Sequence, residues 1–393
     1  MLRKQISLSP DLKKLQDEGY EIEVKSGYLL VHHVPYVNSQ KEIAYGTLVS
    51  KLELASDKTV NPVGDHVMRF IGEHPCNHDG TVITAIQHAS NNEPIVDGLT
   101  TNHSFSSKPP SGQYPDYYQK IITYERILSS QAKHIDTSVT AITFKTIEPD
   151  DEESVHHYID TNSTRADIGL ISAKLKDVRV AIVGLGGTGS YVLDFISKTE
   201  VREIHLFDAD DFLQHNAFRS PGAASKEKLD ERLKKVDYFH GVYSKMHKKI
   251  FSREYHLTDS NLEEISGMDF VFICIDEGKI KKQIAERLIE KKIPFVDTGI
   301  GIQSIDGALI GCIRTTMATP EKNDHLGRRI DFSDGGHDAY TQNIQIAELN
   351  ALNASLAVIK MKKHFGFYYD QEKEYNSSYE ISINKIINDE TNS

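Results

Sequence analysis

"RVAIVGLGGTGSYVLDFI", residues 179–196, decides the fold of the second half of this chain. The continuous apolar run VRVAIVGL (178–185) predicts a buried strand, and GSYVLDFISK (189–198) predicts a helix that begins at the glycines. Glycines let the backbone approach a ligand, and a helix start presents free N–H groups and partial positive charge to phosphates. The stretch therefore predicts a phosphate site, and it leaves open whether the phosphates belong to a redox dinucleotide or to ATP.

The same strand–helix alternation continues along the chain. Continuous apolar strands separated by helical stretches indicate a parallel sheet that is covered on both faces. Residues 344–366 predict a long helix that ends in lysines and a glycine. We therefore expect an α/β fold with a Rossmann-like, mostly parallel sheet over residues 161–370, followed by a polar tail over residues 371–393. The further strands are expected at EIHLFDAD (203–210), MDFVFICID (268–276) and KIPFVDTG (292–299).

Residues 1–147 predict a smaller α+β domain ahead of this sheet. The stretch 20–37 alternates between apolar and polar residues, breaks at Ser26-Gly27 and resumes, which is typical of a hairpin. Other stretches are rich in β-branched residues, which favour strands, or carry apolar residues at helical spacing. The β-branched stretches are 81–86 and 137–147, and the helical stretch is 116–131.

Composition and charge restrict the classes of function. A net charge of −12 over 393 residues argues against a broad nucleic-acid surface, which needs an excess of Lys and Arg on one face. Five of the eight residues 148–155 are acidic, and we expect residues 148–160 to form a solvated linker. No apolar run approaches about 18 residues, and the start lacks the apolar core of a signal peptide. We therefore expect a cytoplasmic protein without a membrane span.

The residues after the second strand favour ATP over a dinucleotide. The glycines at 184, 186 and 189 fit the pattern G-x-G-x-x-G, and Asp208 ends the next strand, where an acid would bind ribose hydroxyls. A dehydrogenase needs only that acid, whereas this chain adds further polar residues that suit phosphate oxygens and Mg²⁺. The added residues are Asp210, Asn216 and Arg219. A nicotinamide-dependent oxidoreductase stays as the alternative.

The combination of these motifs resembles the ThiF/MoeB-type adenylyltransferases. It consists of GxGGxGS at 184–190, DxD followed by N-x-x-R at 208–219, and an acid that closes a later strand. These enzymes share their fold with the adenylation domain of ubiquitin-activating enzymes, and the resemblance covers about residues 160–365. It implies that the chain uses ATP and Mg²⁺ to adenylate a carboxylate, the C-terminus of a small ubiquitin-like or sulfur-carrier protein.

The resemblance also implies how the nucleotide is held. Asp208 would bind the ribose, Asn216 and Arg219 would meet the phosphates, and Asp210 would assist at the nucleotide or the metal. The loop that would hold the phosphates consists of Gly184, Gly186, Gly187, Gly189 and Ser190.

Three further residues match positions that act on the reaction in the family. Lys235 would steady the charge of the departing pyrophosphate, and Asp276 would position Mg²⁺. Arg165 matches an arginine that reaches the ATP of a second subunit, which implies a homodimer. Each has a plainer interpretation, because Lys235 can be a solvated helix lysine, Asp276 a strand-end acid, and Arg165 part of a local ion pair.

The function therefore has several alternatives. Adenylation of a carrier protein comes first. A NAD(P)-dependent oxidoreductase would use the same glycine turn but leaves Asn216 and Arg219 without a purpose. A nucleotide-binding regulatory protein without turnover is the third alternative, and adenylation of a small molecule or a tRNA is the fourth. The acidic net charge disfavours the tRNA.

Many members of the family pass the acyl group to a cysteine of their own. Cys274 and Cys312 lie between apolar neighbours in expected strands, where burial raises the pKa of a thiol and suppresses the thiolate. Cys76 lies in a polar loop between His74 and His78, and protonated histidines lower the pKa of a thiol. Three interpretations stay open for Cys76: an acyl acceptor in a conjugating-enzyme-like domain, a metal ligand with the histidines, or a structural loop residue.

Overall fold

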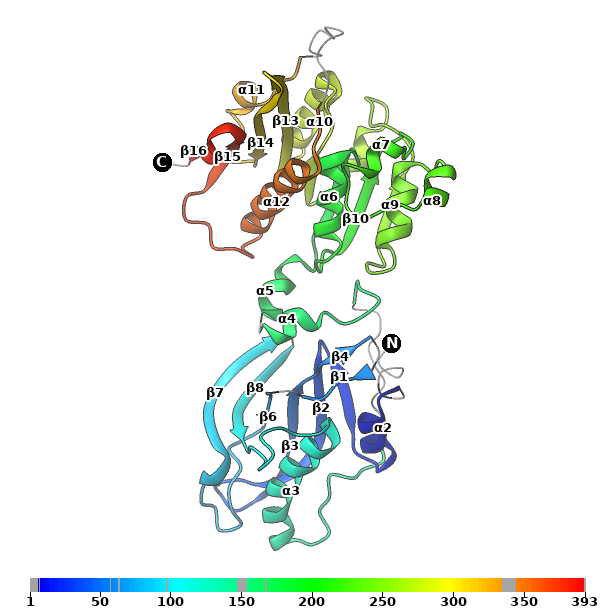
Figure 1. Cartoon of the computed structure of the whole chain (residues 1–393). Coiled ribbons are helices and arrows are strands. Elements are labelled where there is room, and N and C mark those ends of the chain that lie inside the picture. The colour runs from blue at the N-terminus through cyan, green and yellow to red at the C-terminus, as the bar shows by residue number, and fades with distance from the viewer. Residues whose placement is uncertain are drawn as a thin grey trace. The chain divides into compact units, whose positions relative to one another are not determined.

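A computed structural model describes residues 6–391, apart from positions 7, 57, 63, 97, 146, 148–153, 167 and 334–343. Residues 148–153 of the expected acidic linker therefore lie outside the described part. The chain divides into two compact units, residues 1–173 and 174–393 (Figure 1). Residues 161–173, which we expected in the second domain, make their contacts within the first unit.

The first unit is built on an antiparallel sheet and two longer helices. The expected hairpin is confirmed, because Ser26 and Gly27, both at positive φ, join its first two strands. The spatial order of the sheet is β1 (Ile22–Lys25), β2 (Tyr28–Val37), β3 (Ile43–Lys51), β6 (Val67–Ile71), β8 (Leu99–Ser106) and β7 (Gln87–Val96). The other elements are α2 (Pro10–Asp17), α3 (Tyr117–Ile135), β4 (Leu54–Ala55), β5 (Lys58–Thr59), η1 (Thr84–Ile86), α4 (Thr161–Arg165) and α5 (Gly169–Ser172).

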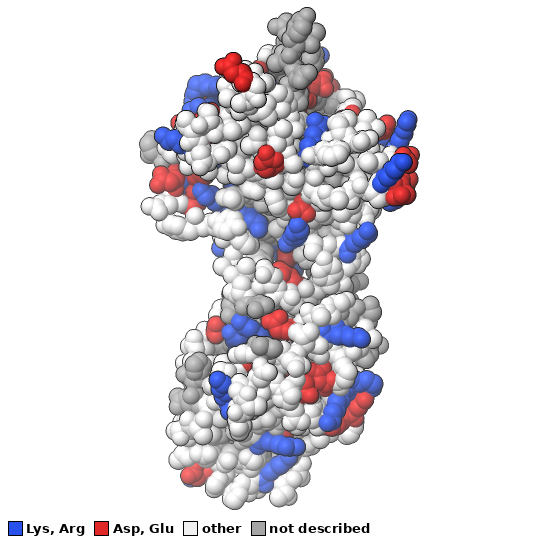
Figure 2. Space-filling view, viewed as in Figure 1, with Lys and Arg blue, Asp and Glu red and all other residues white. Residues whose placement is uncertain are grey.

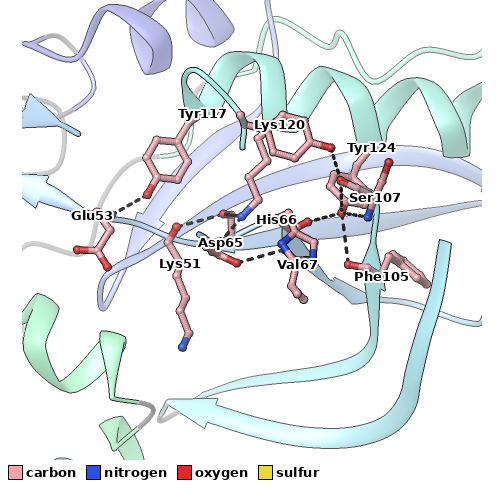
Figure 3. A network of polar contacts seen from close by, with 12 residues as sticks. Lys51, Glu53, Asp65, His66, Val67, Phe105, Ser107, Tyr117, Lys120 and Tyr124 are labelled. Atoms are coloured by element: carbon pink, nitrogen blue, oxygen red, sulfur yellow. Dashed lines mark hydrogen bonds and ion pairs between the residues drawn. The ribbon is translucent and has the colours of Figure 1, made fainter. Parts of the chain in front are cut away.

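Helix α3 is tied to the strand ends by a polar network. Tyr117, Lys120 and Tyr124 lie on one face of α3, and all three point toward the sheet (Figure 3). The Lys120 ammonium donates to the Ser50 hydroxyl at 2.9 Å and to the Asp65 carboxylate at 3.0 Å. The two tyrosine hydroxyls accept hydrogen bonds from backbone N–H groups at the strand ends. The buried polar groups of this network therefore satisfy one another, as a stable core requires.

The two β-branched stretches fold differently from the sequence prediction. Residues 84–86 form the short 3-10 helix η1, and the described part of the second stretch forms no strand but an isolated bridge between Ile142 and Tyr20. The Ser138 N–H and hydroxyl donate to the Asp136 carboxylate at 2.9 and 2.7 Å, and the Ile142 N–H donates to the Thr140 hydroxyl. Such local bonds compete with a strand ladder, so they override the β propensity here.

The second unit is built on an eight-stranded sheet. Its first five strands pair in parallel and the last three add antiparallel pairs, which confirms the mostly parallel sheet. The spatial order is β11 (Ile250–Arg253), β10 (Glu203–Phe207), β9 (Arg179–Val183), β12 (Phe270–Ile273), β13 (Phe295–Ile305), β14 (Ala308–Ala318), β15 (Glu374–Glu380) and β16 (Lys385–Thr391).

Helices cover both faces of this sheet. Apolar side chains of α6 (Gly187–Ile196), α9 (Lys235–Tyr243) and α12 (Ala347–His364) share one core cluster, and those of α10 (Gly278–Glu290) belong to the cluster on the other face. The expected long helix is thus confirmed as α12. The shorter elements are η2 (Ala173–Leu175), α7 (Gln214–Ala217), α8 (Lys226–Asp230), η3 (Leu262–Ile265), α11 (Leu326–Arg329) and η4 (Ile381–Ile383).

The polar segment after residue 370 is part of the sheet rather than a tail. Strands β15 and β16 extend the edge at β14, although their sequence has few apolar residues. Ion pairs hold them. Glu374 lies 3.4 Å from the Lys360 ammonium and 2.8 Å from that of Lys363, and Glu390 bonds Arg329 at 2.9 Å. The partners are distant in sequence, so local composition did not reveal this contact.

Two surface properties bear on the expected classes of function. No described helix is long and apolar enough to cross a membrane. On the face shown in Figure 2, basic and acidic side chains lie interspersed among uncharged ones.

Candidate functional site

The glycine turn lies between β9 and α6, at the carboxyl ends of the parallel strands. β10 pairs with one side of β9 and β12 with the other, and α/β sheets bind ligands where the strand order reverses in this way. Gly184 has φ +89°, and a Cβ at Gly189 would lie 1.9 Å from the Gly184 oxygen. Gly186 precedes α6 and has no described atom within 4 Å of the place of a Cβ. The start of α6 is therefore open to a ligand.

Asp208 lies directly after β10 and is buried. One oxygen of its carboxylate accepts the Leu185 N–H at 2.7 Å, and the other accepts the Asp210 N–H at 2.8 Å. These bonds fasten the glycine turn to the end of the neighbouring strand. Asp208 thus shapes the turn, in addition to the ribose contact that the family resemblance implies.

Lys235 is the first residue of α9 and has 6% of its surface exposed, so it is not a solvated helix lysine. Its ammonium lies 2.6 Å from the Asp210 carboxylate and 3.6 Å from that of Asp208. The hydrogen bond from Lys235 lowers the pKa of the Asp210 carboxyl. The fold therefore brings together the lysine and both acids of the DxD motif.

Asn216 and Arg219 lie on and after the short helix α7. The buried Asn216 side chain accepts the Leu213 N–H at 2.8 Å and so caps this helix. Arg219 carries a buried Nε that has no hydrogen-bond partner among the described residues. Burial lowers the pKa of Arg219, while the charge of Asp276 acts in the opposite direction. A buried N–H without an acceptor is costly, so this guanidinium is suited to an anionic ligand.

Asp276 lies in the loop between β12 and α10, at the expected end of the strand, and is exposed. Because β12 pairs with β9, Asp276 follows the strand next to the one that leads into the glycine turn. The pKa of His215 is lowered, by burial first and then by the charges of Arg219 and Lys235. Lys235 is tied to the glycine turn through Asp208, whose carboxylate accepts the Leu185 N–H. The backbone of Arg219 is tied to the same turn through Asn350, which bonds Thr188.

For Ser190 and Arg165, the structure does not show the contacts that the family resemblance implies. Ser190 is fully buried, and its hydroxyl donates to the Gly187 oxygen at 2.8 Å inside α6. Arg165 ends α4 in the first unit, and its side chain lies outside the described part. The role implied for Arg165 at a second subunit thus stays a prediction.

The Cys76 side chain is buried, which favours the structural interpretation of this residue over that of an acyl acceptor. It is 1% exposed and pairs through its backbone with Val37 and Val82. Burial first, and then the charge of Asp79, raises the pKa of its thiol. The thiol donates to the backbone oxygen of His74 at 3.4 Å. Within the described residues, no cluster of three or more His, Cys, Asp or Glu could hold a metal ion.

The other two thiols are also poor nucleophiles. Cys274 follows β12 beneath the glycine turn, and burial raises the pKa of its thiol to about 12. Cys312 lies in β14, as expected, and burial together with Glu380 raises its pKa. Thiolates carry the nucleophilic chemistry of cysteine, so neither thiol is prepared for acyl transfer.

Sequence reasoning missed buried charges next to this site. Asp297 is the third residue of β13 and is fully buried, with Lys281 3.2 Å and Arg314 2.6 Å from its carboxylate. An acid inside the apolar strand KIPFVDTG was the signal, because a buried carboxylate needs a cation. Asn350, fully buried in α12, was missed as well.

Comparison with protein families also divides the chain in two, with the boundary between residues 161 and 163 rather than after residue 173. Residues 163–328 match the ThiF family, and residues 10–161 match a family described as a domain of unknown function, DUF6791. The second half of the chain therefore contains a ThiF family domain, which confirms the resemblance read from its motifs.

Curated relatives match over part of their length. Ubiquitin-like modifier-activating enzyme 5 of Culex quinquefasciatus is 23% identical over 150 residues, which are 34% of this chain and 36% of that protein. The same enzyme of Drosophila persimilis is 24% identical over 150 residues, 34% and 38% of the two chains. The chain thus spans about a third of the length of these relatives. Among solved structures, E. coli MccB with succinimide has 16% identity and a TM-score of 0.48, over 59% of this chain and 72% of that one.

Proposed function

We propose that the second unit binds ATP with Mg²⁺ and adenylates a carboxylate. The observation that carries the proposal is the buried Arg219 Nε, which has no described acceptor, in a residue whose backbone is joined through Asn350 to the first turn of α6. A triphosphate supplies several anionic oxygens, so it satisfies both the guanidinium and the N–H groups of α6. A dinucleotide would be served by the glycine turn and Asp208 alone.

Mg²⁺ fits the carboxylates that surround this region. Asp276 would hold the ion, and Asp210, whose side chain is 58% exposed, would assist. Mg²⁺ bound together with substrate phosphates needs only one or two protein carboxylates, so a preformed cage is not required. When bound, the ion neutralises charge on the phosphate oxygens.

In the reaction, an oxygen of the substrate carboxylate attacks the α-phosphorus of ATP. A bond forms between them, the bond to the β-phosphate oxygen breaks, and pyrophosphate leaves. Two anions must approach each other, so the protein contributes mainly position and positive charge. Arg219 supplies charge at the phosphates, and Lys235, held by Asp210 and Asp208 within reach of the glycine turn, offsets the charge of the leaving pyrophosphate.

The substrate that we propose is the C-terminal carboxylate of a small ubiquitin-like or sulfur-carrier protein. The names of the curated relatives support this class, because they activate ubiquitin-like modifiers. We further propose a homodimer in which Arg165 of one subunit contacts the ATP of the other. The raised pKa values of the thiols argue that the acyl-adenylate is passed to an acceptor other than a cysteine of the described residues.

Calorimetry with ATP and MgCl2, and separately with NAD⁺ and NADH, tests the nucleotide. We expect ATP to bind, and Arg219→Ala to weaken this binding about tenfold or more, as loss of a charged hydrogen bond does. The matched control is Arg202→Ala, since Arg202 is an exposed arginine of the same unit and should leave affinity unchanged. Binding of NAD(H) without ATP would replace the proposal by the oxidoreductase. Exchange of labelled pyrophosphate into ATP, with and without candidate carrier proteins, then tests the adenylation.

A further inference from the structure

Asn350 joins three segments of the candidate site. It lies in the first turns of α12, is fully buried, and comes from a helix that packs along α6 (Figure 1). Its side-chain oxygen accepts the Thr188 hydroxyl at 3.1 Å, and its amide nitrogen donates to the Arg219 oxygen at 3.2 Å. Thr188 belongs to the first turn of α6, so one amide connects the helix start with the segment that carries the arginine.

Gly187 makes room for this amide. A Cβ at Gly187 would lie 2.0 Å from the Asn350 amide nitrogen, well inside any real contact. Gly186, by contrast, has open space on its Cβ side. The two adjacent glycines therefore do different things: Gly186 leaves the helix start open, and Gly187 admits the side chain that braces it.

A buried asparagine is a costly way to fill a helix core. An amide placed in an apolar surrounding loses its bonds to water, and an apolar side chain would avoid that loss. Among the described residues, the Asn350 amide bonds Thr188 and Arg219, which belong to the two segments that would meet the phosphates. The desolvation cost of this buried amide is explained if ATP binding depends on the distance between these two segments.

We propose that Asn350 is a positioning residue that holds Arg219 at a fixed distance from the start of α6. A triphosphate can then meet the guanidinium and the helix N–H groups together. This rests on the proposed binding of ATP, and it adds a residue on a distant helix that acts through Arg219. It does not touch the nucleotide itself.

Asn353 offers a matched control on the same helix. It is also fully buried, three residues further along, and its amide donates to the Gly299 oxygen at 3.1 Å. Replacing Asn353 by Ala removes a buried amide whose oxygen has no partner among the described residues, and it leaves the bonds of Asn350 to the Arg219 segment in place. A purely structural role for Asn350 predicts that the two substitutions have the same consequences.

The experiment compares Asn350→Ala, Asn353→Ala, Arg219→Ala and the double variant Asn350→Ala/Arg219→Ala by calorimetry with ATP and with AMP, each with MgCl2. We expect Asn350→Ala to weaken ATP binding about tenfold and AMP binding by less than about twofold. Asn353→Ala should change the affinity for either nucleotide by less than about twofold. In the Arg219→Ala background, the Asn350 substitution should cause no further loss, because it acts through that arginine. Equal losses for ATP and AMP, or additive losses in the double variant, would overturn the inference.

Hydrogen exchange without nucleotide supplies a second measurement that does not depend on ATP. Asn350→Asp keeps the shape and the oxygen that accepts from Thr188, but it sets an oxygen against the Arg219 oxygen. We expect faster amide exchange around Arg219 in this variant and in Asn350→Ala, and not in Asn353→Ala. Unchanged exchange around Arg219 would contradict the positioning role even if ATP binds. A wild type that exchanges as expected but binds no ATP would instead refute the proposed function.

Discussion

Lys120 of the first unit and Lys235 of the second are both buried, and the groups around them differ. Lys120 in the first unit is fully buried and meets one carboxylate, that of Asp65, and one hydroxyl, so its charge is balanced within the network (Figure 3). Lys235 in the second unit meets two carboxylates, and nearby Arg219 keeps a buried N–H without a described acceptor. The first cluster is complete as it stands, whereas the second leaves a polar group for a ligand to satisfy.

The difference separates two uses of buried charge. A fully satisfied network contributes to stability and to a unique packing, and removing one partner leaves an uncompensated charge. A cluster with an unsatisfied donor is less stable than it could be, and such sites are typical of binding and catalysis. The comparison predicts opposite effects of substitutions in the two units on the free energy of unfolding.

The largest effect is expected from Asp65→Asn. This change leaves the Lys120 ammonium without its carboxylate in a fully buried place, and we expect a loss of about 3 kcal/mol or more in the stability of the first unit. Native-state hydrogen exchange in β3 and α3 measures the loss separately from the second unit. The double variant Asp65→Asn/Lys120→Met removes both charges and should recover most of it. If amides of β3 and α3 exchange as slowly in Asp65→Asn as in the wild type, the Lys120 network does not stabilise the first unit.

Much of the second unit could be predicted because its signals are local. The continuous apolar runs that end at Val183 and Ile273 fix buried parallel strands, and the glycines after Val183 need no distant partner to form their turn. The acids Asp208 and Asp276 follow strand ends, and the carboxyl ends of parallel strands meet at one edge of the sheet. The fold of this unit thus follows from local patterns, whereas the roles of the site residues rest on the family resemblance and stay predictions.

The failures concern contacts between distant positions. The burial of Cys76 comes from its pairing with Val37 and Val82, which no local pattern in its polar loop announces. The bonds of Asn350 cross to residues far back in the chain, and the strand pair after residue 370 is held by Lys360 and Lys363. Composition describes a segment by itself, so it cannot reveal a partner that only the folded chain provides.

Another buried lysine of the second unit, Lys360, extends the comparison to the effect of pH on stability. Burial lowers its pKa to about 8, although Glu374 lies beside it. Between this value and the ordinary 10.5 the unfolded chain binds the extra proton, so stability rises with pH in that window. We expect a gain of about 2 kcal/mol from about pH 8 to pH 9.5 in the wild type relative to Lys360→Met, by urea unfolding at each pH.

The control for this pH effect is Lys282→Met, because Lys282 is exposed on α10 and should leave the wild-type pH dependence unchanged. Parallel curves for wild type and Lys360→Met would mean that the pair with Glu374 keeps the lysine charged throughout. The charge of Lys360 would then be balanced by Glu374, as the charge of Lys120 is balanced by Asp65.

The smallest expected effect is an increase in stability, which is unusual for the substitution of a buried residue. Arg219→Met replaces a guanidinium that has an unsatisfied buried N–H by an apolar side chain, and we expect the second unit to gain about 1 kcal/mol while ATP binding is lost. Hydrogen exchange in β9 and β12 measures the gain, and Arg202→Met serves as the exposed control. A loss of stability like that of Asp65→Asn would place Arg219 in a structural network. Arg219 would then contribute to the stability of the second unit in the same way as Lys120 and Asp65 contribute to that of the first.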